Sequence, residues 1–401
     1  FKDVFSPIEA ANMIKDTILE SCANHEKLTI KTIPLIDGGE YSNETIFNEL
    51  KCKKIKVKQV ISPIGIAIES NYLALDKETA FIGSSEILRL LPEYDSYKNP
   101  LKLTSYGLGQ LIMHALDNNY KKIIIGLGGT NTVDAGIGMA QALGMLFLDK
   151  NRKILLPKNG KYFCGEDLQN IDEIVDFDKF RYLNKLEIIV LCDSEIDILN
   201  MDIPTNLKIS DTYNNTRKDI LKKLSDGVFN YAQIISDKHK YRMPIEKMES
   251  YGVAGGAVLS ITNIFNNIKL SSGINYFLKK FNVEDEIKKA DIIITGEGRF
   301  DSLIVGKTPT GVSKLAKRNN KSVLLVCGDV DLPLKKYFTD YFCTNIPSHI
   351  KDLGISSIIS CHEYYKDEDI LNTYKEKILM YRVSTPKILE DPVCKYINTQ
   401  N

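Results

Sequence analysis

Two stretches of this chain concentrate the residue types that bind phosphoryl and carboxylate groups. The first begins at Ile125 and reads Ile-Gly-Leu-Gly-Gly-Thr-Asn-Thr-Val-Asp-Ala-Gly-Ile-Gly-Met, so that Gly128, Gly129 and Thr130 follow an aliphatic run. Glycine lets a backbone pass close to a ligand, and the free amides of a following helix suit a phosphate or carboxylate. A tight strand-to-helix turn also needs glycine for steric reasons, so the motif alone supports both interpretations.

The second stretch begins at Gly296, reads Gly-Glu-Gly-Arg-Phe-Asp, and is followed by Lys307. It places Glu297, Arg299 and Asp301 directly after an aliphatic run, where a need for solubility does not explain so many charges. Carboxylates at this place can hold Mg²⁺ or accept a hydroxyl proton, while Arg and Lys bind phosphoryl or carboxylate oxygens. The competing interpretation is a cluster of surface salt bridges.

Other segments add carboxylates and glycines at comparable places. They are Asp37-Gly38-Gly39-Glu40, the pair Cys192-Asp193, and Gly255 and Gly256 within Gly252–Ala257. A single Asp at the end of a strand is more often a helix N-cap or a turn residue than a catalyst. The glycines at the start of an apolar helix suit a phosphate and equally suit close helix packing.

Several familiar catalytic motifs are missing from the sequence. Asp301–Thr308 reads DxxxxGKT and lacks the first glycine of a P-loop, and Pro309 follows it directly. Gly296–Asp301 lacks the last glycine of GxGxxG, which argues against an oxidoreductase with a nicotinamide cofactor. The five histidines have no metal-ligand spacing, and no GxSxG elbow indicates a serine hydrolase.

The elements that must position these residues share one pattern, in which an aliphatic run ends at a polar or glycine residue and helix-like sequence follows. The runs are Thr32–Ile36, Lys122–Ile125, Glu187–Leu191, Asp291–Thr295 and Ser322–Val326. Continuous β-branched runs predict parallel strands that are covered on both faces of an α/β sheet. Because such strands end at one edge, we expect Asp37, Asp193, Glu297, Arg299 and Asp301 to converge on one crevice.

Other elements follow from local signals. Ser6 as N-cap, Pro7 in the first turn and Glu9 as the partner of Ser6 in a capping box predict a helix that starts here. The Lys-rich stretch Phe47–Tyr72 predicts two strands around the turn Ser62–Gly65. Helices are also expected over Leu108–Leu116, where His114 is a core or boundary residue, and over Arg217–Ser236 and Pro244–Tyr251.

Composition excludes several classes of protein. The 401 residues include 52 basic and 52 acidic side chains, so a neutral net charge argues against a nucleic-acid partner or a polybasic membrane patch. No apolar run approaches the ~20 residues of a membrane helix. The eight cysteines form no CxxC pair, which predicts a reduced, cytoplasmic protein. The oligomeric state stays open, with a homodimer as one arrangement.

At these loops the chain resembles the bacterial type I glycerate kinases, and the likeness covers almost its whole length. The motifs that carry it are Phe1-Lys2, Asp37–Glu40, Ser62–Gly65, Ser105–Ile112, Gly128–Gly138, Gln141–Gly144 and Ala290–Arg299. Phe1-Lys2 corresponds to the end of the family's Asp-Ser-Phe-Lys, whose strand would lie before residue 1. Several motifs in the same order are specific, although each alone is weak.

The resemblance implies a kinase with two domains. Residues 1–46 and 284–401 would form a Rossmann-like α/β domain with a parallel sheet, and residues 47–283 an inserted α+β domain that carries the glycine-rich loop. Members of this family transfer the γ-phosphoryl group of ATP to a hydroxyl of D-glycerate, usually giving 2-phosphoglycerate, with the help of Mg²⁺. The partner of this chain would then be a small hydroxy acid.

The resemblance, together with the chemistry of phosphoryl transfer, also implies roles for individual residues. The catalytic set is Lys2, Asp193, Arg299 and Asp301, in which the cations bind substrate oxygens and a carboxylate orients the attacking hydroxyl. Substrate binding is expected of Asp37, Gly38, Gly39, Thr130 and Lys307. Nucleotide phosphates are expected to bind at Gly128, Gly129, Gly255, Gly256 and Gly296. Glu297, with Asp37 as an alternative, would hold the metal ion.

The chain departs from the family pattern at four places. The family's Ile-Glu-Met-Ala is shortened here to a segment that starts Ile82-Gly-Ser-Ser-Glu, and the family's Asn and Gly in the glycine-rich loop are replaced by Val133 and Ala135. The other two departures follow Asp193 and Asp301. The loss of polar groups leaves two alternatives to glycerate phosphorylation, namely a different hydroxy acid or a non-catalytic ligand-binding protein on the same scaffold.

Overall fold

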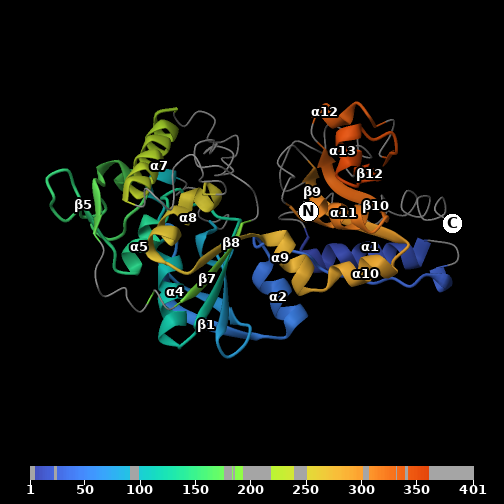
Figure 1. The fold of residues 1–401 in the computed structure, drawn as a ribbon, viewed down its shortest axis with the longest axis horizontal. Coiled ribbons are helices and arrows are strands. Elements are labelled where there is room, and N and C mark those ends of the chain that lie inside the picture. Colours follow the sequence, from blue (N-terminus) through green and yellow to red (C-terminus); the bar gives the residue numbers. More distant parts are fainter. Residues whose placement is uncertain are drawn as a thin grey trace. The chain divides into compact units, whose positions relative to one another are not determined.

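The structure, a computed structural model, describes residues 5–21, 25–90, 99–175, 183, 186–192, 218–238, 251–300, 307–330, 332–338 and 342–360. The chain separates into two compact units (Figure 1). We call Gly38–Gly273 the central unit, and Phe1–Asp37 with Ile274–Asn401 the terminal unit. Both contain helices and parallel strands, so the predicted mixed α/β class is confirmed.

The limits of these units, after residues 37 and 273, differ by nine and ten residues from the predicted domain boundaries after residues 46 and 283. Helix α2 (Ser42–Leu50) contacts strands β2 and β3 of the central unit, which places residues 42–46 there. Ile274 lies in a hydrophobic cluster with Val312 and Val323, which places α9 (Gly273–Lys280) from Ile274 onward in the terminal unit.

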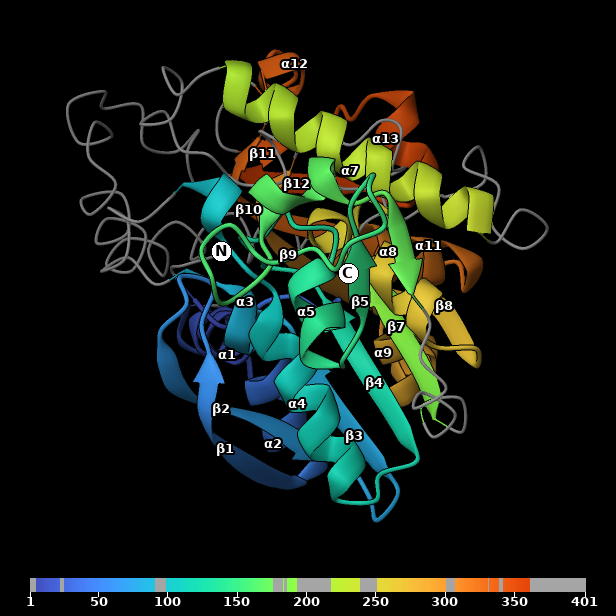
Figure 2. The same ribbon diagram turned by 90° about the vertical axis from the view of Figure 1, so that its left-hand side faces the viewer.

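The central unit is built on a mixed sheet of six strands in the order β1-β2-β3-β4-β7-β8 (Figure 2). The strands are β1 (Lys53–Ile61), β2 (Ala67–Ala74), β3 (Thr79–Gly83), β4 (Lys122–Leu127), β7 (Glu187–Cys192) and β8 (Ile268–Ser272). β1 and β2 are the two strands predicted around the Ser62–Gly65 turn, and they are antiparallel neighbours. β3 is antiparallel to β2, whereas β3, β4, β7 and β8 are parallel. Two predicted aliphatic runs are therefore confirmed as parallel strands, β4 and β7.

Helices cover both faces of this sheet. α4 and α5 lie on one face, and α2 lies on the other (Figures 1 and 2). The helices of the unit are α2, α3 (Ser85–Leu88), α4 (Tyr106–Asp117), α5 (Ile137–Ala142), α7 (Lys218–Lys238) and α8 (Val253–Ile264), with the short 3-10 helices Pro100–Lys102 and Gly165–Asn170. β5 (Leu146–Leu148) and β6 (Glu173–Val175) form a separate antiparallel sheet of two strands.

Of two further helices predicted for the central unit, the structure describes only one along nearly its whole length. α7 matches the helix predicted over 217–236 within two residues at each end, whereas most of Pro244–Tyr251 lies outside the described residues. His114, predicted to be a core or boundary residue, lies in α4 with its Nδ1 3.2 Å from the buried Tyr72 hydroxyl. It has no part in the candidate site described below.

The terminal unit contains a sheet in the order β11-β12-β10-β9, in which β9, β10 and β12 are parallel. Its strands are β9 (Ile292–Phe300), β10 (Ser322–Val330), β11 (Phe342–Cys343) and β12 (Ser357–Ser360). Leu324 packs with Ile18 of α1 on one side, and Leu325 packs with Ile350 of α13 on the other. β10 is thus covered on both faces, as its continuous aliphatic sequence predicts.

The helices of the terminal unit are α1 (Pro7–Ser21), α9 (Gly273–Lys280), α10 (Val283–Lys289), α11 (Thr308–Arg318), α12 (Leu332–Lys335) and α13 (Ser348–Asp352), with a 3-10 turn at His25–Lys27. The capping box of α1 is confirmed, because Ser6 N donates to Glu9 Oε2 at 2.8 Å and Glu9 N donates to Ser6 Oγ at 3.2 Å. Within the described residues, no helix of either unit is long and apolar enough to cross a bilayer.

One predicted strand is wrong. Residues 32–36 form no strand, although Ile33 and Leu35 pack against the core beside α9 and α11. Pro34 stands in the middle of this run and has no N–H group to donate to a neighbouring strand. Its hydrophobic neighbours are half-buried by side-chain packing and do not join a sheet.

The start of α8 has an unusual backbone. Ala254, Gly255 and Gly256 have φ values of 52°, 62° and 82°, all in the left-handed region. The Ala135 amide donates to the Gly255 carbonyl at 3.0 Å, and a Cβ atom on Gly255 would lie 2.0 Å from the Thr132 carbonyl oxygen. Glycine at 255 is therefore required for two backbones to touch.

We expect Gly255→Ala to lower the free energy of unfolding by about 2–4 kcal/mol, because left-handed strain adds to a backbone clash. Gly160→Ala is the matched control, since Gly160 has φ 75° but no atom within 4 Å of its Cβ position. The control should lower the free energy of unfolding by only about 1 kcal/mol, which is the cost of a left-handed backbone for alanine. Urea denaturation followed by circular dichroism measures both, and equal losses would contradict the clash.

Candidate active site

The Asp37–Glu40 motif leads into the carboxyl edge of the central sheet, where Gly38 lies directly against the ends of two parallel strands. A Cβ atom on Gly38, which has φ 96°, would lie 3.2 Å from Leu191 Cβ and 3.4 Å from Gly126 Cα. From the other side, a Cβ on Gly126 would lie 2.5 Å from the Gly38 carbonyl oxygen. This backbone contact brings Gly38 and Gly39 to the ends of β4 and β7.

The same edge brings the Asp-Gly-Gly-Glu loop to the glycine-rich loop. Gly129 has φ 66°, and a Cβ atom there would lie 2.5 Å from Glu40 Cγ and 3.1 Å from Glu40 Oε1. The Glu40 side chain thus extends over Gly129, next to the half-buried Thr130. Sequence reasoning named the motif that contains Glu40 but gave this carboxylate no role, since only the fold shows which loop it meets.

Two serines that follow β3 connect to these loops and were not singled out from the sequence. Ser84 Oγ accepts a hydrogen bond from the Gly128 amide at 3.3 Å and lies 3.4 Å from the Gly128 carbonyl oxygen. Ser85 Oγ donates to the Gly39 carbonyl at 3.4 Å. The carboxyl ends of β3, β4 and β7 therefore form one continuous polar edge, as expected for a ligand site in a parallel sheet.

The far end of the glycine-rich loop is held by a buried carboxylate. Asp134 is 1% exposed, and its Oδ2 accepts from Ser105 N at 2.7 Å, Ser105 Oγ at 2.8 Å and Gly138 N at 3.3 Å. Its Oδ1 accepts from Gly136 N at 3.1 Å. Burial raises the pKa of Asp134, and these hydrogen bonds oppose that rise. Asp134 thus ties the start of α5 to the start of α4.

The Gly-Glu-Gly-Arg motif forms the end of β9 in the terminal unit. Arg299 is exposed and lies beside Asp329 of β10 in the parallel register, and Asp329 Oδ1 is 3.4 Å from Lys335 Nζ. Glu297 Oε1 accepts a hydrogen bond from the Gly298 amide at 2.8 Å. The half-buried Lys307 is the residue that precedes α11. Cations and carboxylates thus gather at the carboxyl edge of this sheet too.

Of the predicted catalytic residues, Lys2, Asp193 and Asp301 lie outside the described residues. The structure assigns Gly38 and Gly39 to the central unit with Thr130, and Gly296, Glu297 and Arg299 to the terminal unit with Lys307. The expected convergence of all these residues on one crevice stays a prediction. Among the described residues, no three His, Cys, Asp or Glu side chains are grouped as a metal site.

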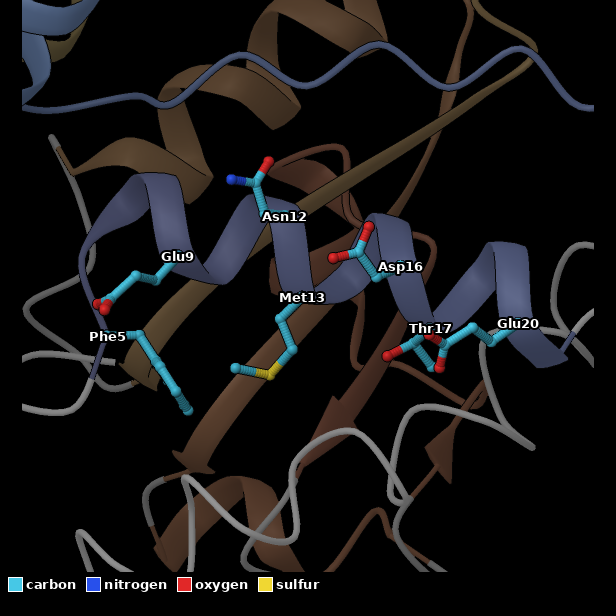
Figure 3. Close-up of a pocket in the computed structure, with 7 residues that line it drawn as sticks. All are labelled: Phe5, Glu9, Asn12, Met13, Asp16, Thr17 and Glu20. Carbon is cyan, nitrogen blue, oxygen red and sulfur yellow. The ribbon is translucent and has the colours of Figure 1, made fainter.

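A pocket of the terminal unit lies along α1, away from these loops in the sequence (Figure 3). Its lining includes three carboxylates, those of Glu9, Asp16 and Glu20, together with Met13 and Phe5. Three negative charges on one helix face would repel a carboxylate or phosphate ligand. A hydroxy acid or a nucleotide would therefore bind elsewhere, and the strand edges remain the candidate site.

Comparison with known proteins shows the family to which this chain belongs. The family model described as "Glycerate kinase family" matches residues 1–352. The chain belongs to the glycerate kinase family. A glycerate kinase of Halalkalibacterium halodurans is 31% identical over 82% of this chain and 83% of its own length. The glycerate 2-kinase of Escherichia coli strain K12 is 29% identical over the same shares.

A solved structure extends the likeness to the fold of the family. The crystal structure of a proposed glycerate kinase 2 from Salmonella typhimurium LT2 has a TM-score of 0.64 and 27% sequence identity to this chain. The match covers 97% of this chain and 96% of that one. Like its relatives, this member of the glycerate kinase family is a phosphotransferase that acts on a hydroxyl group.

We expect Asp134→Asn to lower the free energy of unfolding by about 2–4 kcal/mol, because an amide in place of the carboxylate points N–H groups at N–H and O–H donors. Asp172→Asn is the control, since Asp172 is exposed and gives no side-chain hydrogen bond among the described residues. Urea denaturation monitored by circular dichroism should show no change for the control. Equal stability of both variants would contradict a loop held by Asp134.

Proposed function

We propose that this protein transfers the γ-phosphoryl group of ATP to a hydroxyl of D-glycerate and forms 2-phosphoglycerate. The observation that carries the proposal is the meeting of the Asp-Gly-Gly-Glu and glycine-rich loops at one strand edge, with Glu40 over Gly129. Membership of the glycerate kinase family supports the same activity. The related proteins named glycerate kinase and glycerate 2-kinase share about 30% of their residues with this chain.

We assign substrate binding to the loops of the central edge. Gly38, Gly39 and Thr130 would offer backbone and hydroxyl groups to the hydroxy acid. The other two residues proposed for substrate binding belong to the terminal unit, namely Asp37 and Lys307, a cation for the carboxylate. The glycine positions Gly128, Gly129, Gly255, Gly256 and Gly296 are the proposed contacts of the nucleotide phosphates. At Gly255 the observed backbone packing explains the glycine by itself, so this assignment is the most easily tested of the five.

Phosphoryl transfer needs charge neutralisation and a positioned nucleophile more than covalent chemistry. In our proposal Lys2 and Arg299 bind phosphoryl oxygens, and Asp193 or Asp301 accepts the proton of the attacking hydroxyl. Arg299 is exposed at the end of β9, beside the carboxylate of Asp329 in the neighbouring strand, so its guanidinium belongs to a polar strand edge and not to the core.

A Mg²⁺ ion that accompanies ATP fits the donor set of this edge. Mg²⁺ in kinases is held by one or two carboxylates, with phosphate oxygens and water as the other ligands. Glu297 uses Oε1 to accept from the Gly298 amide, which fixes the carboxylate and leaves Oε2 for a cation. When bound, the ion would supply positive charge to the phosphoryl oxygens.

We expect the complete chain to release ADP in a coupled assay with Mg-ATP and D-glycerate, and Arg299→Ala to lower kcat/KM by about 10³-fold or more, since it removes positive charge from the transferring group. Asp193→Asn should abolish turnover. Lys289→Ala is the control, because Lys289 is an exposed residue of the terminal unit that pairs with Glu286. Its kinetic constants should equal those of the wild type.

The same assay separates the two alternatives to glycerate. A panel of small hydroxy acids tests for an altered substrate, and turnover of another acid with none of D-glycerate would change the substrate assignment. Thermal stabilisation by D-glycerate without ADP release would indicate a non-catalytic binding protein. Absence of turnover with every acid would reject the proposed activity.

A further inference from the structure

The short segment Gly83–Glu86, at the end of β3, contacts both ligand loops of the central unit. Ser84 interacts with both backbone groups of Gly128, and Ser85 donates to the Gly39 carbonyl. This is the segment where the chain departs from the Ile-Glu-Met-Ala of the family and is shorter. The contacts show that the departure has a structural role between the two loops.

Glu86 extends these contacts to helix α2 through a relay of two amides. Asn71 Nδ2 donates to Glu86 Oε2 at 3.2 Å, and Asn43 Nδ2 donates to Asn71 Oδ1 at 3.0 Å. An ionised carboxylate only accepts hydrogen bonds, so Glu86 fixes which way each amide faces. Asn43 lies in the first turn of α2, directly after the Asp-Gly-Gly-Glu loop. The relay therefore holds the helix that continues from that loop.

Gly83 and Asn43 fit each other closely. Asn43 is 2% exposed, and its Oδ1 has no hydrogen-bond partner among the described residues. A Cβ atom on Gly83 would lie 2.6 Å from this Oδ1 and 3.4 Å from Asn43 Cγ. The relay prevents the amide from turning away, because that would break its hydrogen bond to Asn71. A methyl group at position 83 must therefore displace Asn43 and the start of α2.

We propose that Gly83–Glu86 is a positioning segment that sets the spacing between the Asp-Gly-Gly-Glu loop and the glycine-rich loop, and thereby the affinity for the hydroxy acid. The inference rests on the proposed function, since both loops carry proposed substrate contacts. Ser84 sets the position of Gly128, Ser85 that of Gly39, and Glu86 that of α2 through Asn71 and Asn43. None of the segment's side chains needs to touch the substrate.

The first test is a double-mutant cycle between Gly83→Ala and Asn43→Ala. We expect Gly83→Ala to raise KM for the hydroxy acid about tenfold with kcat within about threefold, because the loop that binds the ground state is displaced while the chemical groups are retained. In the Asn43→Ala background the same substitution has room for its methyl group. It should then change KM by less than about twofold, which is strong non-additivity.

A second pair of variants tests the proposal even if Gly83→Ala fails to fold. Glu86→Gln keeps the shape of the side chain, but its amide can donate as well as accept a hydrogen bond, so the amides of Asn71 and Asn43 can turn around. We expect a several-fold rise in KM with an unchanged melting temperature. Glu69→Gln is the matched control, because it is the same substitution on β2 of the same sheet and breaks only the exposed pair with Lys56. The control should leave KM unchanged.

Additive effects of Gly83→Ala and Asn43→Ala on KM, or an unchanged KM in Glu86→Gln, would overturn the positioning role while the kinase activity stands. If the wild type turns over no hydroxy acid, the proposed function itself fails. The segment is then tested by the shift in melting temperature that D-glycerate produces. Loss of this shift in Glu86→Gln and its retention in Glu69→Gln would support the positioning role, and equal shifts would overturn it.

Discussion

The site of the central unit depends on one close contact between two stretches of backbone. Gly38 lies on the ends of β4 and β7 so closely that a Cβ atom on Gly126 would be 2.5 Å from its carbonyl oxygen. A side chain on either residue would lift the Asp-Gly-Gly-Glu loop from the sheet edge. Glu40 lies over Gly129, and Ser85 contacts Gly39. Both contacts require that the backbones of Gly38 and Gly126 stay this close.

The glycine-rich loop is held in its own shape by buried polar groups behind it. Ser260 Oγ donates to the Ala135 carbonyl at 2.7 Å, and the Tyr231 hydroxyl lies 3.0 Å from Ser260 Oγ. Since the proton of Ser260 is given to Ala135, Tyr231 must donate to Ser260, and burial keeps it protonated by raising its pKa. These bonds hold Ala135 at φ 50°, a conformation that costs an alanine about 1 kcal/mol.

Local signals in the sequence predicted much of the fold, and tertiary contacts explain what they missed. The capping box of α1 involves only Ser6 and Glu9, so its prediction needed no knowledge of the fold. The strands β4, β7, β9 and β10 were predicted because burial on both faces leaves a continuous aliphatic run. The run around Pro34 shows the limit of that rule, since an aliphatic run can pack against the core without joining a sheet.

The candidate site was predicted less completely than the fold. The Asp-Gly-Gly-Glu and glycine-rich motifs were both found, but no periodicity in the sequence indicates that Glu40 lies over Gly129 or that Ser84 contacts Gly128. These pairs are 89 and 44 residues apart in the chain, and only the order of the strands brings them together. Asp134 was overlooked for a related reason, because its importance comes from complete burial among donors.

Two of the four departures from the family pattern, those at Gly83 and in the glycine-rich loop, are weak evidence against activity because the residues concerned are buried. Val133 is 1% exposed and Ala135 is 0% exposed, so neither side chain can meet a small soluble substrate at the strand edge. The exchange of Asn for Val133 and of Gly for Ala135 therefore changes packing within the hydrophobic core of the unit. At Gly83 the missing acid leaves space that Asn43 fills, and Glu86 supplies a carboxylate three residues later. Motif loss at a buried position is therefore poor evidence for loss of activity, because such a residue acts on the loops through packing and not by touching a ligand.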